Sequence, residues 1–192
     1  MGENSTRENV GTMIEAFVKA TLAEDVGRGD LYALVEPSVD ATAKIIAKSD
    51  GVIAGVKYIT VLAKLENFEI LWLKKDGEKF LKGETLATLQ GDSHTLLKIE
   101  RTLLNMLLHA SSIATFTSRY VAILQPYGVK LLDTRKTRPM LRLFEKYATR
   151  TGGAVNHRMG LDDSLMIKDP HLKTIKDLNS YILQARKQMP FT

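Results

Sequence analysis

The chain has 192 residues, of which 44% are hydrophobic, and it carries a formal net charge of +5 at pH 7. That length allows one large domain or two small ones with a substantial core. The absence of cysteine excludes disulfides, thiolate metal sites and cysteine nucleophiles, and it is typical of a reducing compartment. The basic balance favours an anionic partner: nucleic acid, a membrane surface or a phosphorylated metabolite.

The N-terminus is polar. Residues 1–9 lack the apolar stretch of a signal peptide, so we predict that they form a flexible leader. No apolar run reaches the ~18–20 residues that a membrane span needs. We therefore expect a soluble, cytoplasmic protein that does not bind membranes.

The first hundred residues alternate between helical and strand patterns. Met13, Ile14 and Phe17 fall on one helical face, which predicts a helix from about Val10 to about Asp25. Apolar runs and turn signals then predict a second helix at residues 57–65 and strands at residues 41–47, 52–54, 68–73 and 86–89. We expect an α+β module of short, antiparallel strands.

A long apolar helix follows. Asp92 or Ser93 is expected to cap it, and it should run to about residue 123. Its apolar face is broad, so we expect it to be buried between domains or between subunits. It carries Arg101, for which two interpretations stay open: a solvated charge, or an arginine delivered to a site elsewhere. We assign residues 10–110 to an N-terminal domain with its linker helix, and residues 111–192 to a second domain.

The second half has the pattern of a strand–helix–strand unit. Residues 129–132 and 164–167 are expected to be strands, and the segment between them predicts a helix that starts at Pro139 and ends near Arg150. A last helix is expected at residues 172–188. One such unit cannot close a barrel, so we expect either that further sequence is missing or that a partner completes the sheet.

Cations follow both predicted strands of this unit. Arg135 and Lys136 come after the first strand, and Lys168 comes after the second. Functional side chains of barrels built from such units lie at the C-terminal ends of strands. From Lys130 to Arg158 there are eight Lys or Arg residues against two acidic residues. We predict that Arg135, Lys136 and Lys168 converge on one rim and bind a small, highly anionic ligand.

His157 and Arg158 are assigned to the same pocket, because they follow a Gly-Gly turn and suit an anionic ligand. The other cations of the region are assigned to solvated faces: Lys130, Arg142, Lys146 and Arg150. No phosphate-binding loop, dinucleotide fingerprint or Ser-His-Asp signature is present, and we assign no metal-ligating residue. Aromatic residues are only 7% of the chain, which argues against nucleic acid as the partner.

The stretch LLDTRKTRPMLRLFEKYATRTGGAVNHRMGLDDSLMIKDPH closely resembles the signature region of the quinolinate phosphoribosyltransferase family. Upstream, LAEDVGRGDL, AKSDGVIAGV, GETLATLQG and ERTLLNMLLHASSIAT resemble that family's N-terminal domain and linker helix. The resemblance runs from about residue 12 to about residue 185. It implies an α/β protein in which an N-terminal α+β sandwich domain precedes an incomplete α/β barrel, assembled as a homodimer.

The resemblance also implies a reaction. Quinolinate and phosphoribosyl pyrophosphate, with Mg²⁺, would give nicotinate mononucleotide, pyrophosphate and CO₂ in NAD biosynthesis. Lys136 and Lys168 would be catalytic, lying between the dicarboxylate and the phosphoribosyl group. Arg101 would reach the neighbouring subunit's active site. The residues that match the family's ligand contacts are Arg101, Thr134, Arg135, Lys136, His157, Arg158 and Lys168.

The chain departs from the family pattern in three ways. Pro170 stands where the family usually has Asn, and Ser112 where it commonly has Gly. The chain also ends before the family's later acidic residues and glycine-rich phosphate loops. Two alternatives remain: a related phosphoribosyltransferase for another anionic heterocycle, or a non-catalytic module that binds anions or dimerises. The prediction requires Arg135, Arg158 and Lys168 to share one cavity.

Overall fold

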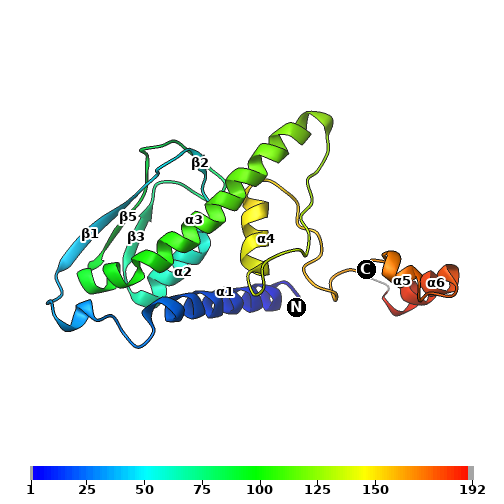
Figure 1. Ribbon diagram of the computed structural model, residues 1–192, viewed down its shortest axis with the longest axis horizontal. Coiled ribbons are helices and arrows are strands. Elements are labelled where there is room, and N and C mark those ends of the chain that lie inside the picture. The colour runs from blue at the N-terminus through cyan, green and yellow to red at the C-terminus, as the bar shows by residue number, and fades with distance from the viewer. Residues whose placement is uncertain (1, 190–192) are drawn as a thin grey trace.

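The computed structural model describes residues 2–189, with side chains from Gly11 onward. Figure 1 shows a sheet-containing body and a small helical segment at the C-terminal end. The elements in chain order are α1 (Gly2–Val26), η1 (Tyr32–Leu34), β1 (Asp40–Ile46), β2 (Gly51–Val52), α2 (Val56–Glu66), β3 (Glu69–Trp72), β4 (Lys79–Phe80), β5 (Thr85–Asp92), α3 (Ser93–Leu124), η2 (Gln125–Tyr127), α4 (Arg142–Thr151), α5 (Asp169–Leu172) and α6 (Leu178–Gln188).

The N-terminal helix is longer than predicted. Residues 2–9, expected to be a flexible leader, belong to α1, which begins at Gly2. No proline interrupts this stretch, so the helical hydrogen bonds of the predicted segment extend toward the N-terminus. Met1 lies outside the described residues.

A three-stranded antiparallel sheet in the order β1-β5-β3 forms the centre of the N-terminal half, and β2 pairs with β4. The four predicted strands are confirmed, and β4 adds a two-residue strand that no sequence pattern indicated. The central strand, β5, buries Leu86, Ala87 and Leu89, and both α2 and α3 pack against the sheet. α1 packs on α2 and α3, inserting the buried side chains of Ile14 and Val18 into the core.

α3 connects the two halves of the chain, as Figure 1 shows. Asp92 caps it as predicted, since its carboxylate accepts a hydrogen bond from the backbone N of Thr95 at 2.9 Å. One face of α3 lies in the core, but the helix is not buried on all sides. Its other face exposes large apolar side chains: Leu97, Leu108, Phe116, Tyr120 and Ile123.

α4 lies against α3. It begins at Arg142 and not at Pro139, because Met140 adopts a left-handed conformation (φ 63°) that a helix cannot contain. Its end is fixed by Gly152, where an added Cβ would lie 2.5 Å from the carbonyl oxygen of Ala114 on α3. Only glycine permits this close approach of the two helices.

The strand–helix–strand unit is only partly formed. The segment 129–132 makes one isolated parallel bridge, between Leu132 and Val155, and residues 164–167 form no strand. The prediction of strands at residues 129–132 and 164–167 is therefore wrong. A strand forms only when a neighbouring strand supplies its hydrogen bonds. The predicted helix at 172–188 is divided into α5 and α6, because Asp177 caps a new start by accepting from Asn179 N at 3.0 Å. α5 and α6 lie apart from the body (Figure 1).

The longest helix, α3, has 32 residues. Within residues 2–189, neither it nor any other helix has both the length and the apolar character that crossing a membrane would require.

Candidate active site

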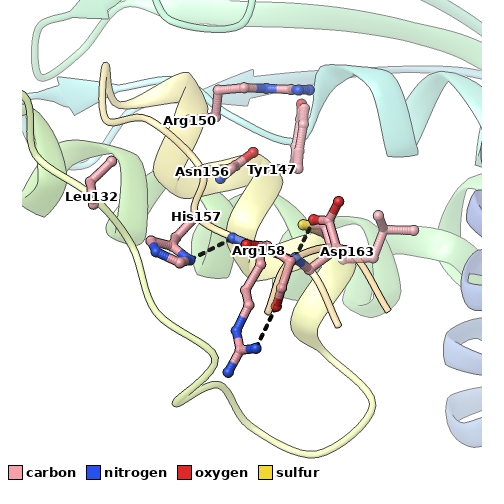
Figure 2. A pocket seen from close by; sticks show the side chains of 10 residues that line it. Leu132, Tyr147, Arg150, Asn156, His157, Arg158 and Asp163 are labelled. Carbon is pink, nitrogen blue, oxygen red and sulfur yellow. Dashed lines mark hydrogen bonds between the residues drawn. The ribbon is translucent and has the colours of Figure 1, made fainter. Parts of the chain in front are cut away.

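A cavity of about 590 Å³ opens beside α4, between that helix and the segment after Ala154. Figure 2 shows the side chains around it. The lining residues are Leu132, Leu143, Tyr147, Arg150, Asn156, His157, Arg158, Met159, Asp163 and Ser164. Two of the predicted site residues, His157 and Arg158, are among them.

The Asp133 carboxylate organises one wall of this cavity. It accepts hydrogen bonds from Lys146 Nζ, from Asn156 Nδ2 at 2.6 Å and from the backbone N of His157 at 2.7 Å. The Asp133 side chain is 7% exposed and that of Lys146 is 1% exposed. The prediction that Lys146 lies on a solvated face is wrong, because this residue is one half of a buried ion pair. A lysine can be buried in this way when a carboxylate compensates its charge.

His157 and Arg158 are held in a fixed relation to each other. His157 Nδ1 accepts a hydrogen bond from the backbone N of Arg158 at 2.7 Å, and Arg158 Nη1 donates to the carbonyl oxygen of Ser164 at 2.6 Å (Figure 2). The second bond uses one of the five N–H donors of the guanidinium. The donors that remain can bind a carboxylate or a phosphate.

The loop with the other predicted cations lies outside the cavity lining. Thr134 Oγ1 accepts from the backbone N of Lys136 at 3.0 Å, which forms a tight turn, and both side chains are exposed. Arg135 is half-buried, and its Nε is shielded from solvent without a hydrogen-bond partner among the residues that the structure describes. At the far end of the loop, Glu145 Oε2 accepts from the backbone N of Arg138 at 3.2 Å.

The predicted convergence of Arg135, Lys136 and Lys168 on one rim is not found. None of the three lines the cavity, so Arg135, Arg158 and Lys168 do not share it. Lys168 is exposed at the N-cap of α5, and residues 164–167, which precede it, form no strand. Arg101 is exposed on α3 and does not line the cavity either.

Sequence reasoning missed several residues of the site. Tyr147, Asn156 and Asp163 line the cavity, and so does Arg150, which we had assigned to a solvated face. Arg142, assigned likewise, is half-buried and donates to Thr137 Oγ1 at 3.2 Å and to the carbonyl oxygen of Met159 at 3.1 Å. One sequence signal could have indicated these residues. Asp133 directly follows an apolar run, and an acid buried at such a position requires a partner of opposite charge.

Mg²⁺ prefers carboxylate oxygens and water. Among the side chains that the structure describes, from Gly11 to Met189, no group of three or more His, Cys, Asp or Glu could hold a metal ion. Asp133 is already occupied by its three donors, and Asp163 Oδ2 accepts from the backbone N of Met159 at 2.8 Å. The described residues therefore do not form a protein site for Mg²⁺.

Two family models match the chain in sequence order. The model described as quinolinate phosphoribosyl transferase, N-terminal domain, matches residues 30–111, and the corresponding C-terminal domain matches residues 113–192. Together they include nearly every element from β1 onward.

Individual relatives agree with these matches. A probable nicotinate-nucleotide pyrophosphorylase [carboxylating] of Synechocystis sp. is 37% identical over 93% of this chain and 62% of its own length. One of Bacillus subtilis is 42% identical over 85% of this chain and 58% of its own length.

Solved structures show the same fold. The nicotinate-nucleotide pyrophosphorylase from Francisella tularensis is 33% identical, with a TM-score of 0.89 over 94% of this chain and 65% of that chain. The chain thus spans about three-fifths of the length of the curated relatives it matches. An N-terminal sheet domain followed by a barrel-like region is the expected architecture, and the chain belongs to the quinolinate phosphoribosyltransferase family.

Proposed function

We propose that the protein joins quinolinate to phosphoribosyl pyrophosphate and decarboxylates the product to nicotinate mononucleotide, a step of NAD biosynthesis. The observation that carries this proposal is the match of both domain models of one family, in order, over residues 30–111 and 113–192. The cavity supports it, because His157 and Arg158 lie side by side in its lining and suit an anionic ligand.

The chemistry asks for positioning and charge stabilisation, without a covalent enzyme intermediate. The pyridine nitrogen forms a bond to ribose C1 as the bond from C1 to pyrophosphate breaks. The bond from ring C2 to its carboxylate then breaks and CO₂ leaves. The electron pair that stays on C2 is stabilised by the adjacent positive nitrogen and takes up a proton.

In this proposal Arg158 and His157 bind the dicarboxylate. Thr134, Arg135, Lys136 and Lys168 do not line this cavity. They are proposed as further contacts on the strength of their motif match alone, with Lys136 and Lys168 between the two substrates. Mg²⁺ is proposed only as a companion of the pyrophosphate group of the co-substrate, because the described residues offer it no carboxylate cluster. The cytoplasmic location stays a prediction.

A homodimer is part of the proposal. α3 exposes Arg101 and the large apolar side chains of Leu97, Leu108 and Phe116, and a cluster of exposed apolar side chains favours a protein contact. We propose that a second copy of the chain covers it and that Arg101 reaches the partner's site. Light scattering should give twice the monomer mass, and Leu108→Glu should reduce that mass to the monomer value.

The activity is tested with quinolinate labelled in its 2-carboxylate. The proposed function predicts labelled CO₂ only when phosphoribosyl pyrophosphate is also present. Nicotinate, which lacks that carboxylate, serves as the matched control and should give no reaction. Turnover with another anionic heterocycle would instead support the related transferase, and binding of quinolinate without CO₂ release would support the anion-binding module.

A further inference from the structure

The buried acid at Asp133 accepts hydrogen bonds from the backbone of His157 and from the side chains of Asn156 and Lys146. Asp133 Oδ1 accepts from Lys146 Nζ and from the His157 backbone N, and Oδ2 accepts from Asn156 Nδ2. Lys146 Nζ also donates to the carbonyl oxygen of Arg158 at 3.3 Å. Each of the three consecutive residues 156–158 is therefore held by one member of the ion pair.

A buried ion pair of this kind contributes little net stability to a fold. Removing two charges from water costs free energy that a pair of apolar side chains would not cost. The pair does provide direction, because its hydrogen bonds fix the backbone N of His157, the backbone O of Arg158 and the side-chain amide of Asn156 at set distances and angles. Its bonds go to the segment that carries His157 and Arg158, and this segment lines the cavity.

The bonds also determine how His157 presents its ring. Its backbone N is used by Asp133, and its Nδ1 accepts from the backbone N of Arg158 at 2.7 Å. A neutral imidazole whose Nδ1 accepts a hydrogen bond carries its proton on Nε2. Nε2–H is then available as a donor to an anion, next to the guanidinium of Arg158.

We propose that Asp133 is a positioning residue: its carboxylate, neutralised by Lys146, fixes residues 156–158 so that His157 Nε2–H and the Arg158 guanidinium can bind one dicarboxylate ligand together. This inference rests on the proposed function for the identity of the ligand. Asp133 itself contacts no ligand in this arrangement, because its three donors already surround it.

The test compares Asp133→Asn with Ser111→Ala in the full 192-residue chain. Ser111 is a suitable control because it is buried, hydrogen-bonds the backbone N and O of Ala54 at 3.1 Å, and does not line the cavity. Three quantities are measured: the ¹⁵N chemical shifts of the His157 ring, the hydrogen-exchange rate of the His157 amide, and the dissociation constant for quinolinate by calorimetry. Where Asp133→Asn fails to fold, Asp133→Asn with Lys146→Met removes the uncompensated ammonium and takes its place.

The proposal predicts that the wild-type His157 ring shows the Nε2–H tautomer. In Asp133→Asn the ring becomes a tautomer mixture, the His157 amide exchanges at least tenfold faster and quinolinate binds at least tenfold more weakly. Ser111→Ala should change none of these by more than twofold. Unchanged ring shifts and exchange in Asp133→Asn, or changed ones with unaltered affinity, would overturn the proposal. If the wild-type chain binds no quinolinate while Asp133→Asn still changes the ring shifts and the amide exchange, the proposed function is overturned and the positioning of residues 156–158 by Asp133 is supported.

Discussion

The hydroxyl of Tyr147 on α4 donates a hydrogen bond to Asp76, the acid that caps α2. Asp76 Oδ1 accepts from the backbone N of Val56 at 3.1 Å, and the backbone N of Gly55 donates to the Tyr147 oxygen at 3.0 Å. One tyrosine thus joins the N-terminal helical layer to the wall of the cavity, since Tyr147 also lines it.

Tyr147→Phe should lower the free energy of unfolding by about 1–3 kcal/mol, because the Gly55 N–H and the Asp76 carboxylate each lose a partner. Urea denaturation followed by circular dichroism measures the change. Tyr181→Phe on α6 is the control, and it should stay within about 0.5 kcal/mol because that tyrosine is at the surface. Equal effects of the two substitutions would show that the Tyr147 hydroxyl adds no stability.

The same network makes stability fall at alkaline pH. Burial raises the pKa of Tyr147 above its usual value of 10.0, and the hydrogen bond to Asp76 and the charge of that residue raise it further. Burial likewise raises the pKa of Tyr58, against a smaller opposing effect of Arg150. The folded state therefore keeps protons that the unfolded state releases above pH 10, so stability is complete below pH 10 and is lost as pH rises beyond it.

Urea denaturation between pH 9 and 11 measures this dependence. The free energy of unfolding should decline with a steeper slope in the wild type than in Tyr147→Phe. A slope that Tyr147→Phe leaves unchanged would exclude this tyrosine as its source.

Gly152→Ala should destabilise the chain by about 1–3 kcal/mol, because the new methyl group overlaps the backbone of Ala114 and forces α4 away from α3. Thermal unfolding measures the loss. Gly83→Ala is a control that separates steric overlap from backbone strain. An added Cβ at Gly83 meets no neighbouring atom, so only the positive φ of 90° makes the substitution unfavourable. If Gly152→Ala leaves the stability intact, α3 and α4 are not in such close contact in solution.

Met140→Gly should stabilise the chain by about 1 kcal/mol, because glycine adopts the left-handed conformation without the penalty that other residues carry. Met140 is 94% exposed with φ 63°, so it pays a backbone penalty without burying its side chain. Asn67→Gly is the matched control, because Asn67 has a similar φ of 55° at the end of α2 but is a residue type that tolerates it. Asn67 is exposed, so the control should change stability by less than about 0.5 kcal/mol. A loss of stability in Met140→Gly would contradict the presence of strain at this position.

The N-terminal half could be predicted from sequence because its signals are local. Apolar periodicity marks α1 and α2, and Asp92 is a cap residue at the start of a long apolar run. The segment 164–167 is also apolar, which is why a strand is predicted there. Whether such a segment forms a strand depends on a neighbouring strand that supplies its hydrogen bonds, and no local sequence pattern specifies that neighbour.

Of the candidate site, the sequence predicts the residues that are adjacent along the chain, but not the contacts between distant residues. His157 and Arg158 were found because they are adjacent in sequence and follow a turn, and the structure places both in the cavity lining. Lys146 resembles any other cation of an exposed helix face, and only its pairing with Asp133, 13 residues away, buries it. Convergence of Arg135 with Lys168 depended on a strand pairing that the structure does not contain.

The most direct measurement is a calorimetric titration of quinolinate into the wild-type chain, Arg158→Met and Lys130→Met. Lys130 is an exposed cation of the same region that does not line the cavity. We expect one quinolinate per chain, binding weakened at least tenfold in Arg158→Met through the loss of charge-assisted hydrogen bonds worth about 1.5–3 kcal/mol, and affinity within twofold of wild type in Lys130→Met. Equal affinity of the wild type and Arg158→Met, or no binding to the wild type, would contradict the assignment of this cavity to a dicarboxylate.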